Sequence, residues 1–168
     1  MSKFKVAAPP PKSLSEAIRM ALVDLEKTEK DPRYEIDMST YHEISLVCDV
    51  CDVCDVCFAG TVMAQTCKLP IDFDLCGSVA GTFGEIWGNY FYALNSIRAY
   101  QVAAAIATVA PGRARDAIEI EDKARTALFV AGLASPGGYY GYAEYGEDPV
   151  AFKQGMGVIA DILEQEGL

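Results

Sequence analysis

Residues 47–64 read VCDVCDVCDVCFAGTVMA and join a repeated triplet to an apolar run. Three copies of Cys-Asp-Val lead into a fourth cysteine, and no charged residue follows until Lys68. The apolar run predicts a short helix from Phe58 to Cys67, which ends before Pro70 because a residue that precedes proline disfavours the helical region. We therefore predict that Cys54–Ala64 is a helix entrance and a buried structural anchor.

Composition limits the class of protein. Of the 168 residues, 51% are hydrophobic and 23% are charged, which is enough apolar material for one well-buried core. The net charge of −10 repels phosphate backbones, so we expect no direct contact with nucleic acid. The acidic charge could instead imitate nucleic acid toward a basic protein, although it also serves solubility.

The sequence predicts a cytoplasmic protein. The longest apolar stretch, Val102–Ala110, is too short to cross a bilayer, and residues 1–6 lack the hydrophobic region of a signal peptide. In a reducing compartment the six cysteines would be thiols or metal ligands rather than structural disulfides.

Helical periodicity covers most of the chain. Ser13 and Glu16 have the spacing of a capping box, and the apolar stripe that follows ends near Asp31-Pro32. Three later helices are predicted at 83–110, with a break near Gly84 or Gly88, at 116–131, and from Pro149 onward, where Asp148 is the predicted cap.

Two segments alternate apolar and acidic residues as strands do. They are Tyr34–Met38 and Ile71–Cys76, and residues 39–43 between them are predicted to form a loop with the single histidine. We predict a mainly α fold, a single globular domain of about five helices at 13–168, preceded by a flexible proline-rich arm at 1–12. One small antiparallel β element would pair 34–38 with 139–145, which leaves an α+β fold as the alternative. The apolar fraction also indicates a homo-oligomer.

A glycine–tyrosine stretch is the candidate binding site, with Tyr139, Tyr140, Tyr142 and Tyr145 as its residues. Tyrosine rings offer flat faces and directional hydroxyls to a ligand or protein partner. The alternative is that these rings pack on the strand at 34–38 and on helices. The arginines considered for an anionic ligand are Arg98, Arg113 and Arg115.

The four cysteines Cys48, Cys51, Cys54 and Cys57 form a hypothetical zinc or iron–sulfur site. On a helix their sulfurs would sweep through about 180° and could not converge. The interleaved aspartates would add negative charge beside anionic thiolates. We therefore predict no metal and no cofactor, and keep a metal-binding protein as an alternative.

A second alternative is a cysteine-dependent hydrolase. Cys57 at a helix start would be the nucleophile and His42 its base, because a helix N-terminus lowers a thiol pKa. A single histidine without a surrounding catalytic signature is more typical of a structural group, so we predict no catalytic residues.

Several short motifs resemble a group of small, uncharacterised bacteriophage proteins with a Cys-x-Val-Cys-x-Ala-Gly-x-Val-Met-Ala run. The matching segments are Cys54–Ala64, Asp37-Met38 with Tyr41-His42-Glu43, Ala93–Arg98, and Asp148-Pro149 with Phe152. Cys48 and Cys51 depart from that pattern as extra copies of the triplet. The resemblance implies a non-catalytic accessory protein of the infected cell, acting in host interaction or anti-defence by binding a host protein or a small nucleotide signal.

Overall fold

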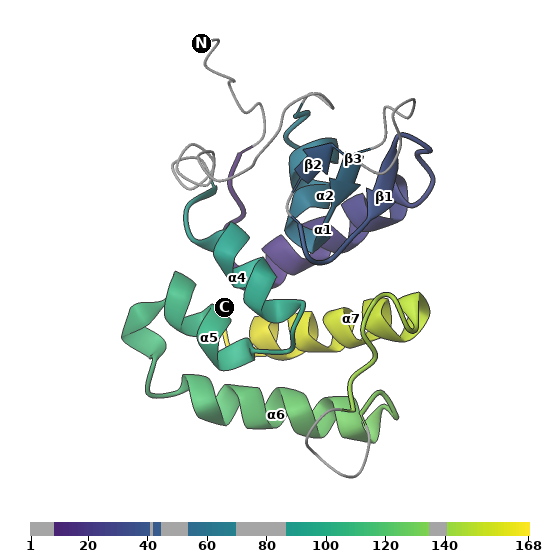
Figure 1. Ribbon diagram of the computed structural model, residues 1–168. Helices are drawn as coiled ribbons and strands as arrows, with labels where there is room; N and C mark the ends of the chain where they lie inside the picture. Colours follow the sequence, from purple (N-terminus) through teal and green to yellow (C-terminus); the bar gives the residue numbers. More distant parts are fainter. Residues whose placement is uncertain (1–8, 41, 45–53, 70–86, 135–140) are drawn as a thin grey trace. The chain divides into compact units, whose positions relative to one another are not determined.

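The computed structural model describes residues 9–40, 42–44, 54–69, 87–134 and 141–168 (Figure 1). In these ranges the chain is mostly helical, which confirms the mainly α prediction. The α-helices are α1 (Leu14–Thr28), α2 (Phe58–Gln65), α4 (Tyr90–Ile97), α5 (Val102–Val109), α6 (Ala117–Val130) and α7 (Pro149–Gln165), with a 3-10 turn η1 (Pro111–Arg113).

The chain falls into two compact units. The first contains residues 1–10 and 20–91, and the second contains residues 11–19 and 92–168. The predicted single domain at 13–168 and the predicted arm at 1–12 stay predictions, and the predicted strand at 71–76 lies outside the described residues.

The first unit contains a three-stranded mixed sheet of order β1-β3-β2, formed by β1 (Tyr34–Ile36), β2 (His42–Ile44) and β3 (Cys54–Val56). β1 runs parallel to the central strand β3, and β2 runs antiparallel to it. The predicted antiparallel pairing of 34–38 with 139–145 was therefore wrong, and so was the loop prediction for 42–43. Alternation identifies a strand but not its partner, and here the last Cys-Asp-Val triplet supplies the partner.

The β3–α2 junction is the buried anchor that the sequence predicts. Cys57 has an extended backbone (φ −88°, ψ −175°) at the N-cap of α2, so the chain turns from strand to helix within one residue. Every residue of α2 from Phe58 to Ala64 is buried. A helix that is apolar on all sides must be covered on all sides, and this one therefore lies inside its unit.

The second unit is helical, with α6 in contact with both α5 and α7 (Figure 1). The predicted long helix at 83–110 is two helices within its described part, α4 and α5. The predicted break near Gly88 is confirmed, since this glycine has φ +55°. A second break occurs at Tyr100, whose φ of +59° ends the preceding helix. The hydrophobic period continues across Tyr100, so it carried no signal of this break.

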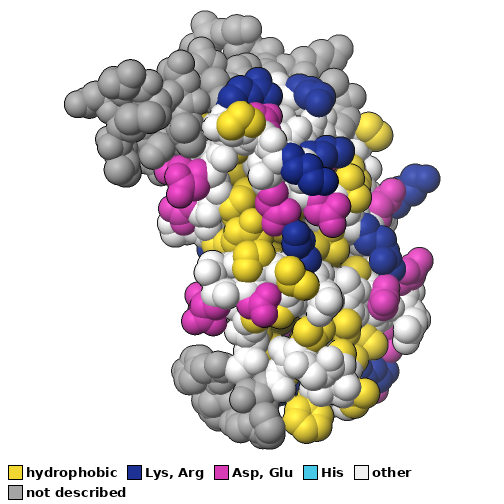
Figure 2. All heavy atoms as spheres, turned by 90° about the vertical axis from the view of Figure 1, so that its right-hand side faces the viewer, with side chains coloured by type: hydrophobic (Ala, Val, Ile, Leu, Met, Phe, Trp, Pro, Cys, Tyr) yellow, Lys and Arg dark blue, Asp and Glu magenta, His cyan; other side chains and the backbone are white. Residues whose placement is uncertain are grey.

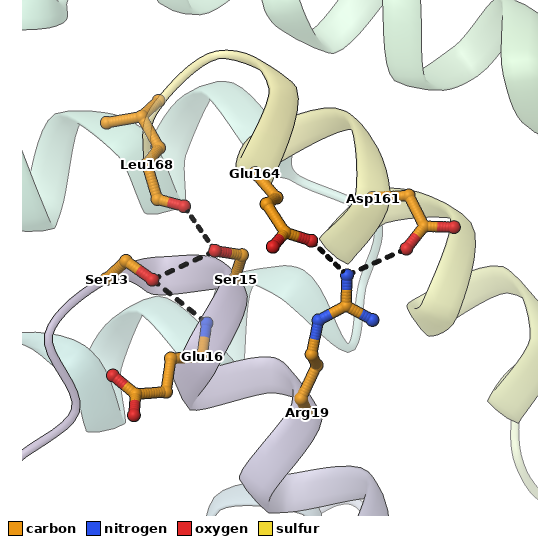
Figure 3. Close-up of polar contacts among 7 residues, drawn as sticks. All are labelled: Ser13, Ser15, Glu16, Arg19, Asp161, Glu164 and Leu168. Carbon is orange, nitrogen blue, oxygen red and sulfur yellow. Dashed lines mark hydrogen bonds and ion pairs between the residues drawn. The ribbon is translucent and has the colours of Figure 1, made fainter.

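Polar contacts in the second unit connect the start of α1 to the end of α7 (Figure 3). The Ser13 hydroxyl accepts from the Glu16 amide at 3.1 Å, which confirms the predicted cap. The buried Ser15 hydroxyl donates to the Leu168 carbonyl at 2.6 Å. Arg19 forms ion pairs with Asp161 and Glu164 on one face of α7.

Candidate functional site

The described tyrosines of the candidate site lie on other aromatic rings. Tyr142 stacks on Tyr100 with 4.4 Å between ring centroids and 16° between planes. Tyr145 meets Phe152 of α7 edge to face, with centroids 5.7 Å apart at 89°. Both tyrosines are partly exposed. Tyr139 and Tyr140 lie outside the described residues.

Tyr100 is the centre of this cluster. Its hydroxyl donates to the Ala143 carbonyl at 2.9 Å, and its ring meets Phe152 edge to face at 6.5 Å. Burial raises the pKa of Tyr100 to about 12, so the hydroxyl keeps its proton and remains a donor at neutral pH. The ring is thus held by a hydrogen bond, a stacking partner and an edge contact.

Gly155 makes room for Tyr100 on α7. A Cβ placed at this glycine would lie 3.1 Å from the Tyr100 hydroxyl oxygen and 3.5 Å from Leu128. Any side chain here would push against a ring that is already fixed. Close approach of ring and helix backbone therefore depends on the missing Cβ.

Arg125 of α6 is the arginine beside the tyrosines. A side-chain hydrogen bond with Tyr142 is the largest cause of the raised pKa of Arg125. The guanidinium also pairs with Glu121 at 3.2 Å and Asp122 at 3.1 Å on its own helix. Arg125 thus lies beside Tyr142, while two carboxylates balance its charge.

The three arginines considered from the sequence have other positions. Arg113 pairs with Asp116 and Glu166, and Arg98 donates to the Asn95 side chain. Arg115 is exposed between η1 and α6.

The backbone around Tyr142 and Tyr145 is tied at both ends. Tyr142 forms an isolated antiparallel bridge with Ala134, which follows α6. The Glu144 carbonyl accepts from the amides of Glu147 and Asp148, which closes a turn before α7. The Asp148 carboxylate then caps α7, as predicted, by accepting from two of its amides. The tyrosines therefore stand on a short, anchored segment.

The described cysteine thiols are buried, in contrast to the partly exposed tyrosines. Cys54, Cys57 and Cys67 have no more than 1% of their surface exposed. Burial, followed by the nearby charge of Asp24, raises the pKa of Cys67 to about 12. Asp24 is itself buried and accepts from the Thr66 hydroxyl and from Lys27. Cys67 is therefore a packed thiol without thiolate character.

The β-sheet brings the backbone of His42 near the proposed nucleophile. His42 pairs across the ladder with Val56, the residue before Cys57. The Cys57 side chain is 1% exposed and makes no capping hydrogen bond. A reaction at this sulfur would first require the junction to open.

For a metal, the described part of the run contributes only Cys54 and Cys57. Among the described residues, no three His, Cys, Asp or Glu side chains are grouped so as to hold an ion. Cys48 and Cys51 lie outside the described ranges, so both the prediction of no metal and the alternative of a four-cysteine site stay untested. Elemental analysis of anaerobically purified protein distinguishes the two, and stoichiometric zinc or iron would support the four-cysteine site.

Sequence reasoning missed Tyr100, Phe152 and Arg125 as parts of the tyrosine site. The predicted helices at 83–110 and 116–131 contained Tyr100 and Arg125, and the helix predicted from Pro149 onward contained Phe152. The only signal in the sequence that could have indicated these residues was the clustering of aromatic residues near the glycine-rich stretch. The contacts depend on the turn at Tyr100, which redirects the chain.

A comparison of the chain with models of protein families, with curated proteins and with solved structures found no match. Within the residues described above, no helix has both the length and the apolar character needed to cross a membrane. The phage resemblance stays a prediction.

Proposed function

We propose that this protein is a non-catalytic, phage-type accessory protein that acts in the host cytoplasm by binding, with Tyr142 and Tyr145 in its contact surface. One observation carries this proposal. Both rings are partly exposed, and both rest on buried or half-buried rings that fix their orientation. Aromatic side chains of this kind supply much of the energy at protein interfaces.

Fixed rings favour binding because they lose little freedom when a partner arrives. Immobilising a mobile side chain costs about 0.5–1.5 kcal/mol at an interface. The stack on Tyr100 already restricts the Tyr142 ring, so less of that cost remains to be met on binding. The segment is therefore prepared for contact before any partner is present.

The charges near Tyr142 favour a host protein over a small nucleotide signal. Nucleotide phosphates need cations whose charge is not already balanced. Arg125, the cation beside Tyr142, is paired with Glu121 and Asp122. A protein surface can use the ring faces and the carboxylates together, so we take a host protein as the partner and the nucleotide as the alternative.

The test is recovery of a partner from infected cells. Tagged protein would be purified under native conditions and weighed by native mass spectrometry, alongside Tyr142→Ala, Tyr145→Ala and Tyr92→Ala. Tyr92 is the matched control, because it is a tyrosine of the second unit that is 42% exposed and lies on α4. Circular dichroism would first establish that each variant is folded.

We expect the wild type and Tyr92→Ala to retain a stoichiometric partner that Tyr142→Ala and Tyr145→Ala lose. A wild type that retains nothing would overturn the proposal, as would folded Tyr142 and Tyr145 variants that retain the same partner. A retained mass of nucleotide size would support the alternative ligand instead.

A cysteine-dependent hydrolase is the second candidate, favoured by the pairing of His42 with the residue before Cys57. Its test is iodoacetamide labelling as a function of pH, read by peptide mass spectrometry. An activated Cys57 would label well below the ordinary thiol pKa of about 8.5, and His42→Ala would remove that reactivity. Labelling that follows an ordinary or slower thiol would exclude the mechanism.

A further inference from the structure

Exposed apolar side chains continue the tyrosine surface onto α6. Phe129 is 53% exposed and Val130 is 80% exposed, at the last turn of this helix. Phe129 follows Arg125 by four residues, so the two share a helix face with about 5–6 Å between their Cβ atoms. Ala134, five residues after Phe129, forms a backbone bridge with Tyr142, and Arg125 lies beside the same tyrosine, so the end of α6 adjoins the segment that carries Tyr142 and Tyr145.

This apolar area is not an isolated side chain. Figure 2 shows hydrophobic side chains at the surface in its lower part, at the height of α6 and α7 in Figure 1. Leu133, after the helix, is half-buried and its amide donates to Leu128. We call Phe129, Tyr142 and Tyr145 the docking face. Exposed apolar surface beside polar residues is typical of interaction sites.

The rim of the docking face is acidic. Residues 133–153 contain three carboxylates and one lysine, Lys153. The carboxylates belong to Glu144, Glu147 and Asp148, and all three residues are exposed. On the α6 side, Glu121 and Asp122 outnumber Arg125. The sign of the local field is therefore negative.

The exposed apolar rings and the acidic rim together indicate which class of partner would bind the docking face. From these features we infer that the docking face binds a basic protein segment that carries an apolar anchor. Lysine or arginine side chains meet the carboxylates at the rim, and the anchor lies on Phe129 and the tyrosine rings. The inference rests on the proposed function and names the class of its partner.

Two other occupants fit less well. A second copy of the chain would bring the same acidic rim against itself in a two-fold interface, at a net charge of −10 for each copy. Nucleic acid would place phosphates against the carboxylates. Charge complementarity thus favours a basic partner.

Defined peptides test the partner class with the full-length protein. The probe is a fluorescein-labelled peptide of alternating lysine and leucine with one central tryptophan. One reference peptide has glutamate in place of lysine, and the other has serine in place of leucine and tryptophan. Binding is followed by fluorescence anisotropy at about 50 mM and about 300 mM salt, across which screening increases.

We expect the basic amphipathic peptide to bind at least about tenfold more tightly than either reference, with weaker binding at the higher salt. Phe129→Ser should weaken it by about tenfold, as expected for a central anchor, and the double change Glu144→Gln, Glu147→Gln by a smaller factor. Ile118→Ser is the matched control. Ile118 is 68% exposed on the same helix, about 16 Å from Phe129 along the axis.

Equal binding of the acidic peptide would overturn the inference, and so would an Ile118→Ser loss as large as that of Phe129→Ser. Absence of binding by all three peptides would also count against it. If Tyr142-dependent partner capture from cells persists in these cases, only the partner class fails. If that capture is absent as well, the proposed function fails too.

Discussion

The β3–α2 junction and the docking face are the two regions of unusual composition, and they have opposite relations to solvent. At the junction, Cys54, Cys57 and Phe58 are exposed by no more than 1%. On the docking face, Phe129 is 53% exposed and Tyr142 is partly exposed on a supporting ring. Residue type alone suggested chemistry at both places, whereas the structure buries the first region and leaves the second partly exposed to solvent.

The difference originates in what surrounds each segment. The cysteines lead into a helix whose seven residues from Phe58 to Ala64 are all buried, so their thiols serve as small apolar groups. The tyrosines belong to a segment held from beneath by Tyr100 and Phe152. Aromatic side chains are thus buried on one side of this cluster and exposed to solvent on the other.

The largest expected effect tests the junction as an anchor. Phe58→Ala removes a fully buried ring at the start of α2 and should lower the free energy of unfolding by about 3–5 kcal/mol. Urea unfolding followed by circular dichroism measures it. Phe129→Ala is the matched control, and its exposed ring should cost less than about 0.5 kcal/mol. Equal losses for the two phenylalanines would contradict the contrast between the regions.

The support beneath the docking face gives the second prediction. Gly155→Ala would place a methyl group 3.1 Å from the fixed Tyr100 hydroxyl. We expect a loss of about 1–2 kcal/mol, because overpacking exceeds the gain in helix propensity. The control is Gly157→Ala, two residues along α7, where a Cβ meets nothing within 4 Å.

The two glycine variants should move the thermal midpoint in opposite directions. Gly157→Ala should raise stability by up to about 1 kcal/mol through helix propensity. Only Gly155→Ala should also weaken binding at the docking face, since Tyr142 stacks on Tyr100. If Gly155→Ala is as stabilising as Gly157→Ala, Tyr100 is free to move and the rings are not fixed.

Alkaline pH provides the third comparison. The pKa of Cys67 rises from 9.0 to about 12 on folding, and that of Tyr100 from 10.0 to about 12. Between these values the folded chain keeps protons that the unfolded chain releases. The contribution of these two groups to the free energy of unfolding is therefore constant below pH 9. As pH rises from 9 toward 12, that contribution is lost and the free energy of unfolding falls.

Urea unfolding in a reducing buffer at about pH 8, 9.5 and 11 separates the two groups. Cys67→Ala should flatten the decline from pH 9 upward, and Tyr100→Phe should flatten it only above pH 10. A decline that is the same in Cys67→Ala and wild type would show that this thiol ionises in the folded protein as it does when unfolded.

Local signals predicted much of the fold. The caps at Ser13 and Asp148, the helix start at Phe58 and the break at Gly88 are confirmed. Each depends on residues within one helical turn, so the sequence carries the information directly. The buried character of α2 was predictable for the same reason, because its residues are apolar on every side.

Long-range pairing was not predictable. Tyr34–Ile36 was identified as a strand, but its partner Cys54–Val56 belongs to a segment interpreted as a helix entrance. In the candidate site, two of the four predicted tyrosines lie on rings whose role depends on the turn at Tyr100. A tyrosine with positive φ is stabilised by its tertiary contacts, and the residues next to it in the sequence do not predict this conformation.

The smallest expected effect comes from two matched arginines. Arg19 and Arg125 are each about half exposed, and each pairs with two carboxylates. Replacing either by glutamine should cost less than about 1 kcal/mol, because exposed ion pairs are screened, and the cost should fall further at about 1 M salt.

Of the two arginines, Arg125 is the one that lies beside a residue of the docking face, Tyr142. Arg125→Gln should therefore change the anisotropy titration with the basic peptide, whereas Arg19→Gln should leave it unaltered. Removing this cation makes the rim more negative but frees the Tyr142 side chain, and both changes act locally. If Arg19→Gln alters binding as much as Arg125→Gln, net charge rather than an ordered face governs the interaction, and the docking face loses its separate role.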